Sequence, residues 1–146
     1  MSKTKSFSHV ITLHIRDSCL CLHTQRAARS LARRFDEALK PAGITSEQFS
    51  LLVSLNRPYP PRLGEVAELL AMDRTTLTAN LKPLQREGFV DVRPDPEDRR
   101  GRILVLTPVG RKVLRRALPL WRRAARESET RLKDAARTRA DLQALS

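Results

Sequence analysis

The chain has 146 residues, with 28 Lys or Arg against 16 Asp or Glu and a net charge of +12 at pH 7. A globular chain this basic is typical of proteins that bind a polyanion, either a nucleic acid or an anionic membrane. No apolar run approaches the roughly 18 residues of a membrane span, and the N-terminus lacks the apolar block of a secretory signal, so we expect a cytoplasmic protein. Cys19 and Cys21 are the only cysteines, which excludes a disulfide framework.

Two helices are predicted in the first third of the chain. From about His9 to Lys40, apolar residues recur at steps of three, four and seven, which predicts one long amphipathic helix that ends before Pro41. Thr45 or Ser46 can cap a second helix, whose nearly all-apolar composition indicates burial on most sides. The prolines that follow Asn56 end this helix, because proline cannot continue it.

A pair of helices joined by a tight turn comes next. The first is expected at about Leu63–Ala71, with Leu69 among its inward residues. Asp73 can cap the second, at about Arg74–Glu87. The residues of the second helix that recur at steps of four and three, and should face the core, are Leu77, Leu81 and Leu84.

A strand, a charged turn and a second strand follow the helix stop at Gly88. Phe89–Arg93 alternates like a half-buried strand, and Arg102–Thr107 is the returning strand. The turn between them, Pro94–Gly101, carries the acidic and arginine residues of the sequence DPEDRRGR. Arg62 can add a short strand edge.

Two further helices complete the predicted fold. Pro108 can begin a long helix that runs to about Arg131 and that Pro119 should kink, and a last helix is expected at about Ala135–Leu145. The predicted fold is mainly α with a small β-hairpin wing, that is, a winged helix-turn-helix domain with a helical dimerisation region. A two-fold dimer is expected because the long helices offer more apolar surface than this small domain can cover.

The second helix of the tight pair presents small hydrogen-bonding side chains outward. Such side chains can approach base edges in a major groove about 12 Å wide, where Asn can pair with adenine and Thr can contact a phosphate or a thymine methyl. The arginines of the turn can enter a narrow minor groove, although the same hairpin could be a solvated charged loop. The candidate DNA-binding residues are Arg74, Thr75, Thr76, Thr78, Ala79, Asn80 and Lys82 on the helix and Arg99, Arg100 and Arg102 at the turn.

Three segments carry a family resemblance: GITSEQFSLLVSL, LGEVAELLAMDRTTLTANLKPLQREGFV and DPEDRRGRILVLTPVGRKVL. Over about Cys21 to Trp121 the chain closely resembles the MarR family of bacterial winged helix-turn-helix regulators. The resemblance implies an obligate homodimer, built from the N- and C-terminal helices, that addresses a pseudo-palindrome with two recognition helices. It also implies that Asp98 braces the wing and that Arg100 enters the minor groove. Ala79 stands where similar sequences often have a basic residue, and Arg74 either contacts a phosphate or braces Asp98.

The segment from Cys19 to His23 is the candidate sensor, and four interpretations are open. The cysteines can be small buried hydrophobes, or Cys21, with Cys19 as a second candidate, can be a redox switch. Within one helix the two cysteines point about 200° apart, so a local disulfide is not expected. Cys19 and His23 share a face, but further metal ligands are not evident, and neither a metal nor a cofactor is expected. The fourth interpretation is a pocket for a small aromatic or carboxylate ligand between the first, second and fifth helices, with Arg29 and Arg33 as anchors or as a solvated face.

We therefore expect a transcriptional regulator, a repressor that binds a pseudo-palindromic operator in double-stranded DNA as a homodimer and is released by a small-molecule ligand. The expected domains are a dimerisation helix at 1–44, a DNA-binding domain at 45–107 and dimerisation helices at 108–146. The alternatives are a thiol-based repressor that uses Cys21 and an architectural DNA-binding protein without a sensor. An enzyme is not expected, because the sequence carries no metal-ligand spacing, Gly-rich phosphate loop or nucleophile elbow. No membrane partner is expected.

Overall fold

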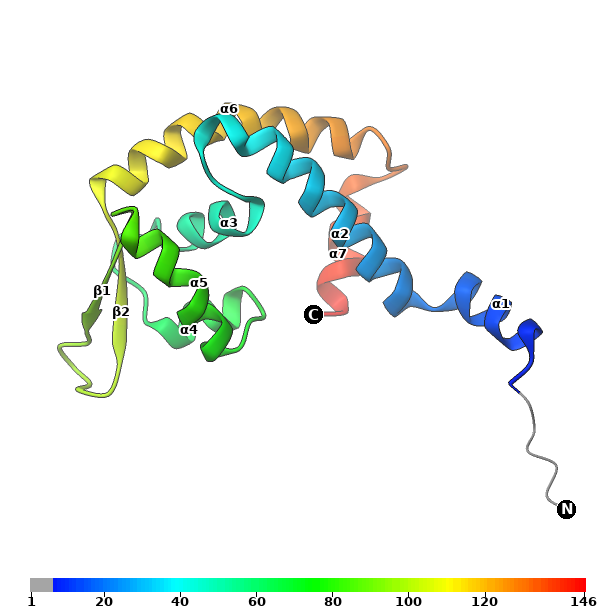
Figure 1. Cartoon of the computed structure of the whole chain (residues 1–146), viewed down its shortest axis with the longest axis horizontal. Coiled ribbons are helices and arrows are strands. Elements are labelled where there is room, and N and C mark those ends of the chain that lie inside the picture. Colours follow the sequence, from blue (N-terminus) through cyan, green and yellow to red (C-terminus); the bar gives the residue numbers. More distant parts are fainter. Residues whose placement is uncertain (1–6) are drawn as a thin grey trace, which may run out of the picture.

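The computed structural model describes residues 7–146. Residues 1–6 lie outside the described part. The predictions for these six residues, as part of the dimerisation segment and as lacking a secretory signal, are therefore not addressed by the structure. The described chain forms helices α1–α7, a short 3-10 helix and an antiparallel pair of strands. The predicted fold class, mainly α with a β-hairpin wing, is confirmed (Figure 1). Between residues 7 and 146, no helix combines the length and the apolar character that a membrane span requires.

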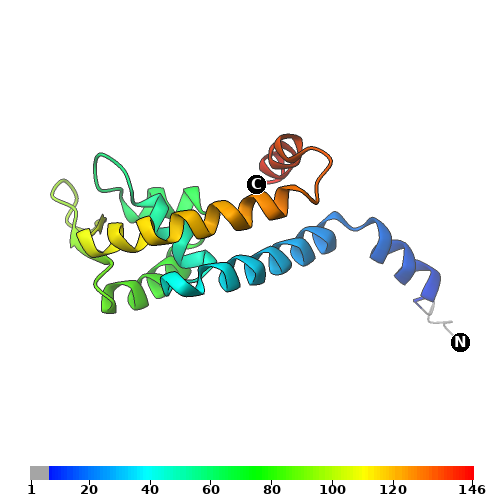
Figure 2. The same cartoon turned by 90° about the horizontal axis from the view of Figure 1, so that it is seen from above.

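Two helices stand where the sequence predicts one. Helix α1 spans His9–Ser18 and helix α2 spans Leu20–Leu39. The chain is extended at Cys19, whose Sγ accepts a hydrogen bond from the Leu22 N–H at 3.4 Å and so caps α2. The prediction of one continuous helix is wrong, because apolar spacing does not reveal a one-residue break that a side-chain cap stabilises. Helix α1 contains no buried residue and extends away from the body of the molecule (Figures 1 and 2).

The chain turns sharply between α2 and α3. A 3-10 helix at Lys40–Ala42 is followed by Gly43, whose φ of 76° is in the left-handed region that glycine tolerates best. Helix α3 spans Ser46–Ser54 and begins at the predicted cap. Thr45 Oγ1 accepts from the Gln48 N–H at 3.2 Å, and the Gln48 side chain accepts from the Thr45 N–H at 3.0 Å. This reciprocal capping box satisfies two backbone donors at the helix start.

The predicted helix pair is confirmed. Helix α4 spans Leu63–Leu69 and helix α5 spans Arg74–Arg86. Asp73 caps α5 as predicted, because its Oδ1 accepts from the Thr76 N–H at 2.7 Å. Leu69 is 61% exposed, so its predicted inward position is wrong. It lies about 100° around the helix from the buried side of α4.

The predicted wing is also confirmed. Strand β1 spans Val90–Pro94 and pairs antiparallel with β2, Arg102–Leu106. Arg62 forms an isolated bridge with Ile103, which is the predicted short strand edge. The register pairs Val90 with Leu106, Val92 with Leu104 and Pro94 with Arg102.

Helix α6, Pro108–Glu129, starts directly against the wing. Thr107 Oγ1 accepts from the Gly110 N–H at 3.0 Å, and the Thr107 hydroxyl donates to the Gly88 carbonyl at 2.6 Å. A Cβ on Gly110 would lie 2.3 Å from the carbonyl oxygen of Phe89. Only glycine therefore allows the first turn of α6 to rest on the chain that enters β1.

Two helices pack side by side above the winged domain, and one helix stands apart. Helix α6 continues through Pro119 and runs alongside α2 (Figure 2). Helix α7, Ala135–Ala144, contains no buried residue. The helices at both ends of the described chain thus contribute nothing to its core.

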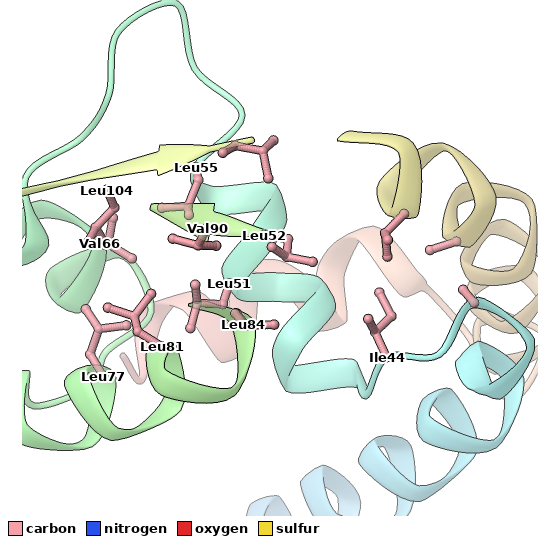
Figure 3. Packing of buried hydrophobic residues seen from close by; sticks show 14 of the residues in the cluster. Ile44, Leu51, Leu52, Leu55, Val66, Leu77, Leu81, Leu84, Val90 and Leu104 are labelled. Carbon is pink, nitrogen blue, oxygen red and sulfur yellow. The ribbon is translucent and has the colours of Figure 1, made fainter. Parts of the chain in front are cut away.

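One apolar core lies between α3, α4, α5 and the hairpin (Figure 3). The predicted inward side chains of α5 are all buried there. Leu39 and Ala117 extend the cluster to the helices above. Its largest fully buried members are Leu39, Leu51, Leu52, Leu77, Leu81, Leu84, Leu104, Val66 and Val90. Because three leucines of α5 point into this core, the opposite face of α5 must point out.

Candidate nucleic-acid interface

The outward face of α5 carries the residues predicted to contact DNA. All of them are exposed except Asn80, which is half-buried. The exposed residues are Arg74, Thr75, Thr76, Thr78, Ala79 and Lys82. The helix thus offers a small-residue surface with a cation near each end.

Two threonine hydroxyls on this helix already have partners. The Thr76 hydroxyl donates to Asp73 Oδ2 at 2.8 Å, and the Thr78 hydroxyl donates to the Arg74 carbonyl at 2.8 Å. Hydrogen bonds from the Thr76 backbone N–H and then from its hydroxyl hold the pKa of Asp73 below its usual range. Because that pKa is lowered by folding, the cap stabilises α5 at neutral pH, and this stabilisation is lost as the pH falls through the lowered pKa.

Asn80 faces the protein as well as the surface. Its Nδ2 donates to Glu47 Oε1 at 3.0 Å and lies 3.6 Å from the Met72 sulfur. The predicted bidentate pairing of Asn80 with adenine would need its amide nitrogen, which here joins α5 to the start of α3. Sequence reasoning missed Glu47 in this place, because nothing in the spacing of residues 47 and 80 signals the contact.

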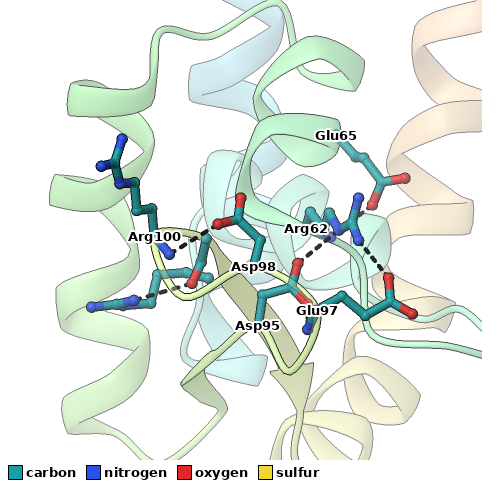
Figure 4. A network of polar contacts seen from close by, with 8 residues as sticks. Arg62, Glu65, Asp95, Glu97, Asp98 and Arg100 are labelled. Carbon is teal, nitrogen blue, oxygen red and sulfur yellow. Dashed lines mark hydrogen bonds and ion pairs between the residues drawn. The ribbon is translucent and has the colours of Figure 1, made fainter.

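An ion-pair cluster connects the wing to the start of α4 (Figure 4). Arg62 Nε lies 2.8 Å from Asp95 Oδ2, and Arg62 Nη2 donates to Glu97 Oε2 at 2.8 Å. The Asp95 side chain is only 4% exposed, and its Oδ2 has no partner other than this guanidinium among the described residues. The Arg62 N–H also donates to Glu65 Oε2 at 2.7 Å, so one residue joins helix and wing.

Asp98 acts within the tip of the wing. Its Oδ1 accepts from the Arg100 N–H at 3.0 Å, and its carbonyl accepts from the Gly101 N–H at 2.9 Å. The bracing role that the resemblance implies for Asp98 stays a prediction, and the structure adds Asp95 as the acidic residue that ties the wing to Arg62. The sequence signal for Asp95 is weak, since it is one of five consecutive acidic or proline residues, Pro94–Asp98, in a predicted turn.

The arginines of the wing and of α5 meet on one side of the molecule. A polar pocket of 400 Å³ between α4, α5 and the wing tip is lined by Arg74, Arg100 and Arg102, among others. Arg74 Nη2 lies 2.8 Å from the point that a Cβ on Gly64 would occupy, so the guanidinium lies across this glycine of α4. Arg102 Nη1 donates to the Gly101 carbonyl at 3.0 Å, and Arg99 is exposed at the tip.

The candidate sensor residues lie far from this surface along the chain. Cys19 is half-buried and Cys21 is exposed, with the Gln25 amide donating to the Cys21 sulfur at 3.4 Å. His23 Nδ1 lies 2.8 Å from the Cys19 carbonyl. Over residues 7–146, no three His, Cys, Asp or Glu side chains are grouped to hold a metal ion. The expected angle of about 200° between the cysteines assumed one helix and does not apply across the break at Cys19.

A groove between α3 and α6 is the candidate ligand site. Its volume is 430 Å³, and the ring of Phe49, one of its lining residues, stacks on Trp121 with the ring centroids 6.0 Å apart. The predicted anchors Arg29 and Arg33 are exposed on α2 and are not among its lining residues. The groove is lined by Phe49, Val53, Asn56, Arg111, Leu114, Arg115 and Leu118.

The chain is similar to known transcriptional regulators in sequence and in structure. A sequence model of the MarR family matches residues 44–101. The transcriptional activatory protein BadR of Rhodopseudomonas palustris is 33% identical over 91 residues, which are 60% of this chain and 52% of BadR. The transcriptional repressor MprA of Escherichia coli is 32% identical over 104 residues, which are 68% of this chain and 56% of MprA. The chain spans about half the length of these curated relatives.

A solved structure extends the similarity to almost the whole chain. The crystal structure of the M. tuberculosis transcriptional regulator MosR in complex with DNA matches with a TM-score of 0.82 and 38% sequence identity. The match covers 88% of this chain and 93% of that chain.

Replacement of Arg62 by alanine should loosen the wing, because it leaves the buried Asp95 carboxylate without its cation. We expect amide hydrogen exchange in residues 95–101 to become roughly tenfold faster. The loss of a fully buried ion pair would accelerate exchange more, but Arg62 is half exposed and solvent screens the pair. Hydrogen exchange measured by mass spectrometry checks this. The matched control is Arg93→Ala, which removes an exposed ion pair with Asp91 in the same hairpin. Equal exchange in the two variants would contradict a bracing role for Arg62.

Proposed function

Because the chain belongs to the MarR family of DNA-binding transcriptional regulators, we propose that it binds a pseudo-palindromic operator as a homodimer, represses transcription there and is released by a small-molecule ligand. The observation that carries this proposal is the exposed face of α5 beside an arginine-bearing wing. In the proposed complex α5 enters the major groove, and Arg100 at the wing tip enters the adjacent minor groove.

The proposal of a homodimer rests on apolar side chains that the described chain leaves uncovered. On α1, Val10 is 75% exposed and Ile11 and Ile15 are each 45% exposed, and on α7, Leu142 is 45% exposed. A second copy can cover such faces, and the proposed dimerisation segments are therefore 1–44 and 108–146. A two-fold dimer would present its two α5 helices to half-sites about 34 Å apart.

Repression is the proposed outcome of operator binding. MprA is named a repressor, whereas BadR is named an activatory protein, so the relatives include proteins named for either effect on transcription. An architectural protein without a sensor remains the competing proposal for the same surface. It would use the basic charge alone and bind with little sequence preference.

The test of this proposal is a footprint on the DNA upstream of the gene, combined with sedimentation of the complex. We expect one protected pseudo-palindrome and two chains per duplex. Replacement of Arg100 by alanine should weaken operator binding and lower the slope of log K against log salt by about one phosphate contact. Arg122→Ala is the matched control, because it removes an exposed arginine of α6 away from the wing.

Protection without sequence preference would favour the architectural protein. One chain per duplex would contradict the dimer. An Arg100→Ala slope equal to that of Arg122→Ala would remove the wing from the interface.

The groove between α3 and α6 is the proposed ligand site. Most of its lining residues are apolar or aromatic, and Arg111 and Arg115 are its two charged lining residues. Arg111 donates to the Leu106 carbonyl at 3.1 Å, whereas Arg115 makes no ion pair or side-chain hydrogen bond within residues 7–146. Arg115 is therefore available for the carboxylate of a small aromatic acid, which would form a charge-assisted hydrogen bond.

Replacement of Arg115 by alanine should raise the concentration of aromatic acid needed to release DNA by about tenfold, because one charged hydrogen bond is lost. Titration of the protein–operator complex with a panel of aromatic acids measures this. Arg29→Ala is the matched control and should leave the release concentration unchanged. A larger increase of the release concentration for Arg29→Ala than for Arg115→Ala would instead place the carboxylate anchor on α2.

A thiol switch is the second proposal, and the exposure of Cys21 favours it. A hydroperoxide can oxidise the Cys21 thiolate to a sulfenic acid and is itself reduced to the alcohol. The break at Cys19 removes the fixed helical geometry that would keep the two sulfurs apart.

Replacement of Cys21 by serine should abolish the release of operator DNA by cumene hydroperoxide if the thiol is the sensor. Cys19→Ser is the comparison variant, and it should retain release if the sulfenic acid of Cys21 alone is sufficient. Anisotropy of labelled operator follows both. Release that is equal in wild type and both variants would exclude a thiol mechanism and leave the ligand mechanism standing.

A further inference from the structure

We infer that α5 discriminates bases chiefly through the C5-methyl group of thymine, which Thr78 and Ala79 contact, and not through side-chain hydrogen bonds to base edges. The inference rests on the proposed entry of α5 into the major groove and specifies what the helix reads there. DNA binding itself follows from membership of the family, whereas the chemical group that α5 recognises on the bases does not.

Three polar side chains of the outward face are engaged within the protein, whereas the exposed Thr75 has no such hydrogen bond within residues 7–146. The hydroxyls of Thr76 and Thr78 donate to Asp73 and to the Arg74 carbonyl. The Asn80 amide nitrogen donates to Glu47. A side chain that reads a base edge must give up these partners first, which reduces the net gain from the new hydrogen bond.

What remains outward at the middle of the helix is small and apolar. Because the hydroxyl of the exposed Thr78 donates back to the Arg74 carbonyl, the γ-methyl is the part of this side chain left for contact with a partner. Ala79 adds a second methyl beside it. A shallow groove of 360 Å³ runs over this surface, lined by Arg74, Thr75, Thr78, Ala79 and Lys82. Its middle therefore offers apolar contact.

The two cations in this groove are suited to phosphates. Arg74 and Lys82 are eight residues apart, which corresponds to about 12 Å along the helix axis. The two long side chains therefore flank Thr78 and Ala79 from both directions along the helix, where they can reach phosphates on either side of the contacted bases. Phosphate contacts set position and orientation but carry no sequence information. Between these cations, Thr78 and Ala79 at the middle of the groove offer methyl groups for base discrimination, and Thr75 beside Arg74 is the one lining residue with an unengaged hydroxyl within residues 7–146.

Thymine is the base that matches such a surface. Of the four bases, it alone presents a methyl group in the major groove, beside its O4 acceptor. Deoxyuridine pairs identically and lacks only that methyl, so a dT-to-dU exchange isolates the contact. The loss expected for one methyl is about fourfold in affinity, equivalent to about 0.8 kcal/mol.

The experiment uses the operator found by footprinting and replaces each thymine of one half-site by deoxyuridine. Anisotropy titrations with the full chain should find at least one position where the exchange weakens binding about fourfold. Two variants then separate methyl from hydroxyl. Thr78→Ser keeps the hydroxyl and should lose the dT/dU difference at one position. Thr78→Val keeps the methyl and should retain it.

Three outcomes would overturn the inference. Specific operator binding without any dT/dU difference would leave the proposed function intact and remove methyl readout. A difference retained by Thr78→Ser and lost by Thr78→Val would assign readout to the hydroxyl. The absence of any sequence preference with wild-type protein would overturn both the inference and the proposed operator function. Circular dichroism of both variants checks that their folds are unchanged.

Discussion

The packing of one face of α5 into the core is the constraint on which the rest of the structure depends. Leu77, Leu81 and Leu84 are almost completely buried against α3, α4 and the hairpin. A helix with three such anchors cannot rotate about its axis without exposing large apolar side chains, which costs about 1.5–3 kcal/mol for each. The side chains opposite the anchors, from Arg74 to Lys82, are therefore held toward solvent in a defined orientation.

The wing is positioned relative to this face by polar contacts. Arg62 joins the start of α4 to Asp95 and Glu97 of the wing, and the Thr107 hydroxyl joins the end of β2 to Gly88, just after α5. These contacts lie at opposite ends of the hairpin. The hairpin cannot swing without breaking one of them, so a rigid two-part surface results.

Local chemistry accounts for the parts of the fold that the sequence predicts well. The Asp73 cap, the leucine stripe of α5 and the alternation of the wing strands each depend on residues within a few positions of one another. Contacts between distant residues were not predictable in this way. The Arg62–Asp95 and Asn80–Glu47 pairs each span 33 positions, and the break at Cys19 preserves the apolar spacing of a continuous helix. The sequence therefore predicts the candidate DNA-binding surface, but not the ion pair and the hydrogen bond that hold its side chains in place.

Helix α6 connects the proposed ligand site, the α3–α6 groove, to the wing. Its first turn has no free space, because Gly110 contacts the chain that enters β1 and Arg111 donates to the carbonyl of Leu106 in β2. Arg115 lies one turn further along the same helix, in the groove. We propose that a ligand in this groove acts by shifting α6, because α3 is held by the same leucine core that orients α5. In the proposed mechanism this movement would alter the angle between the wing and α5, on which the proposed simultaneous entry of the two elements into DNA depends.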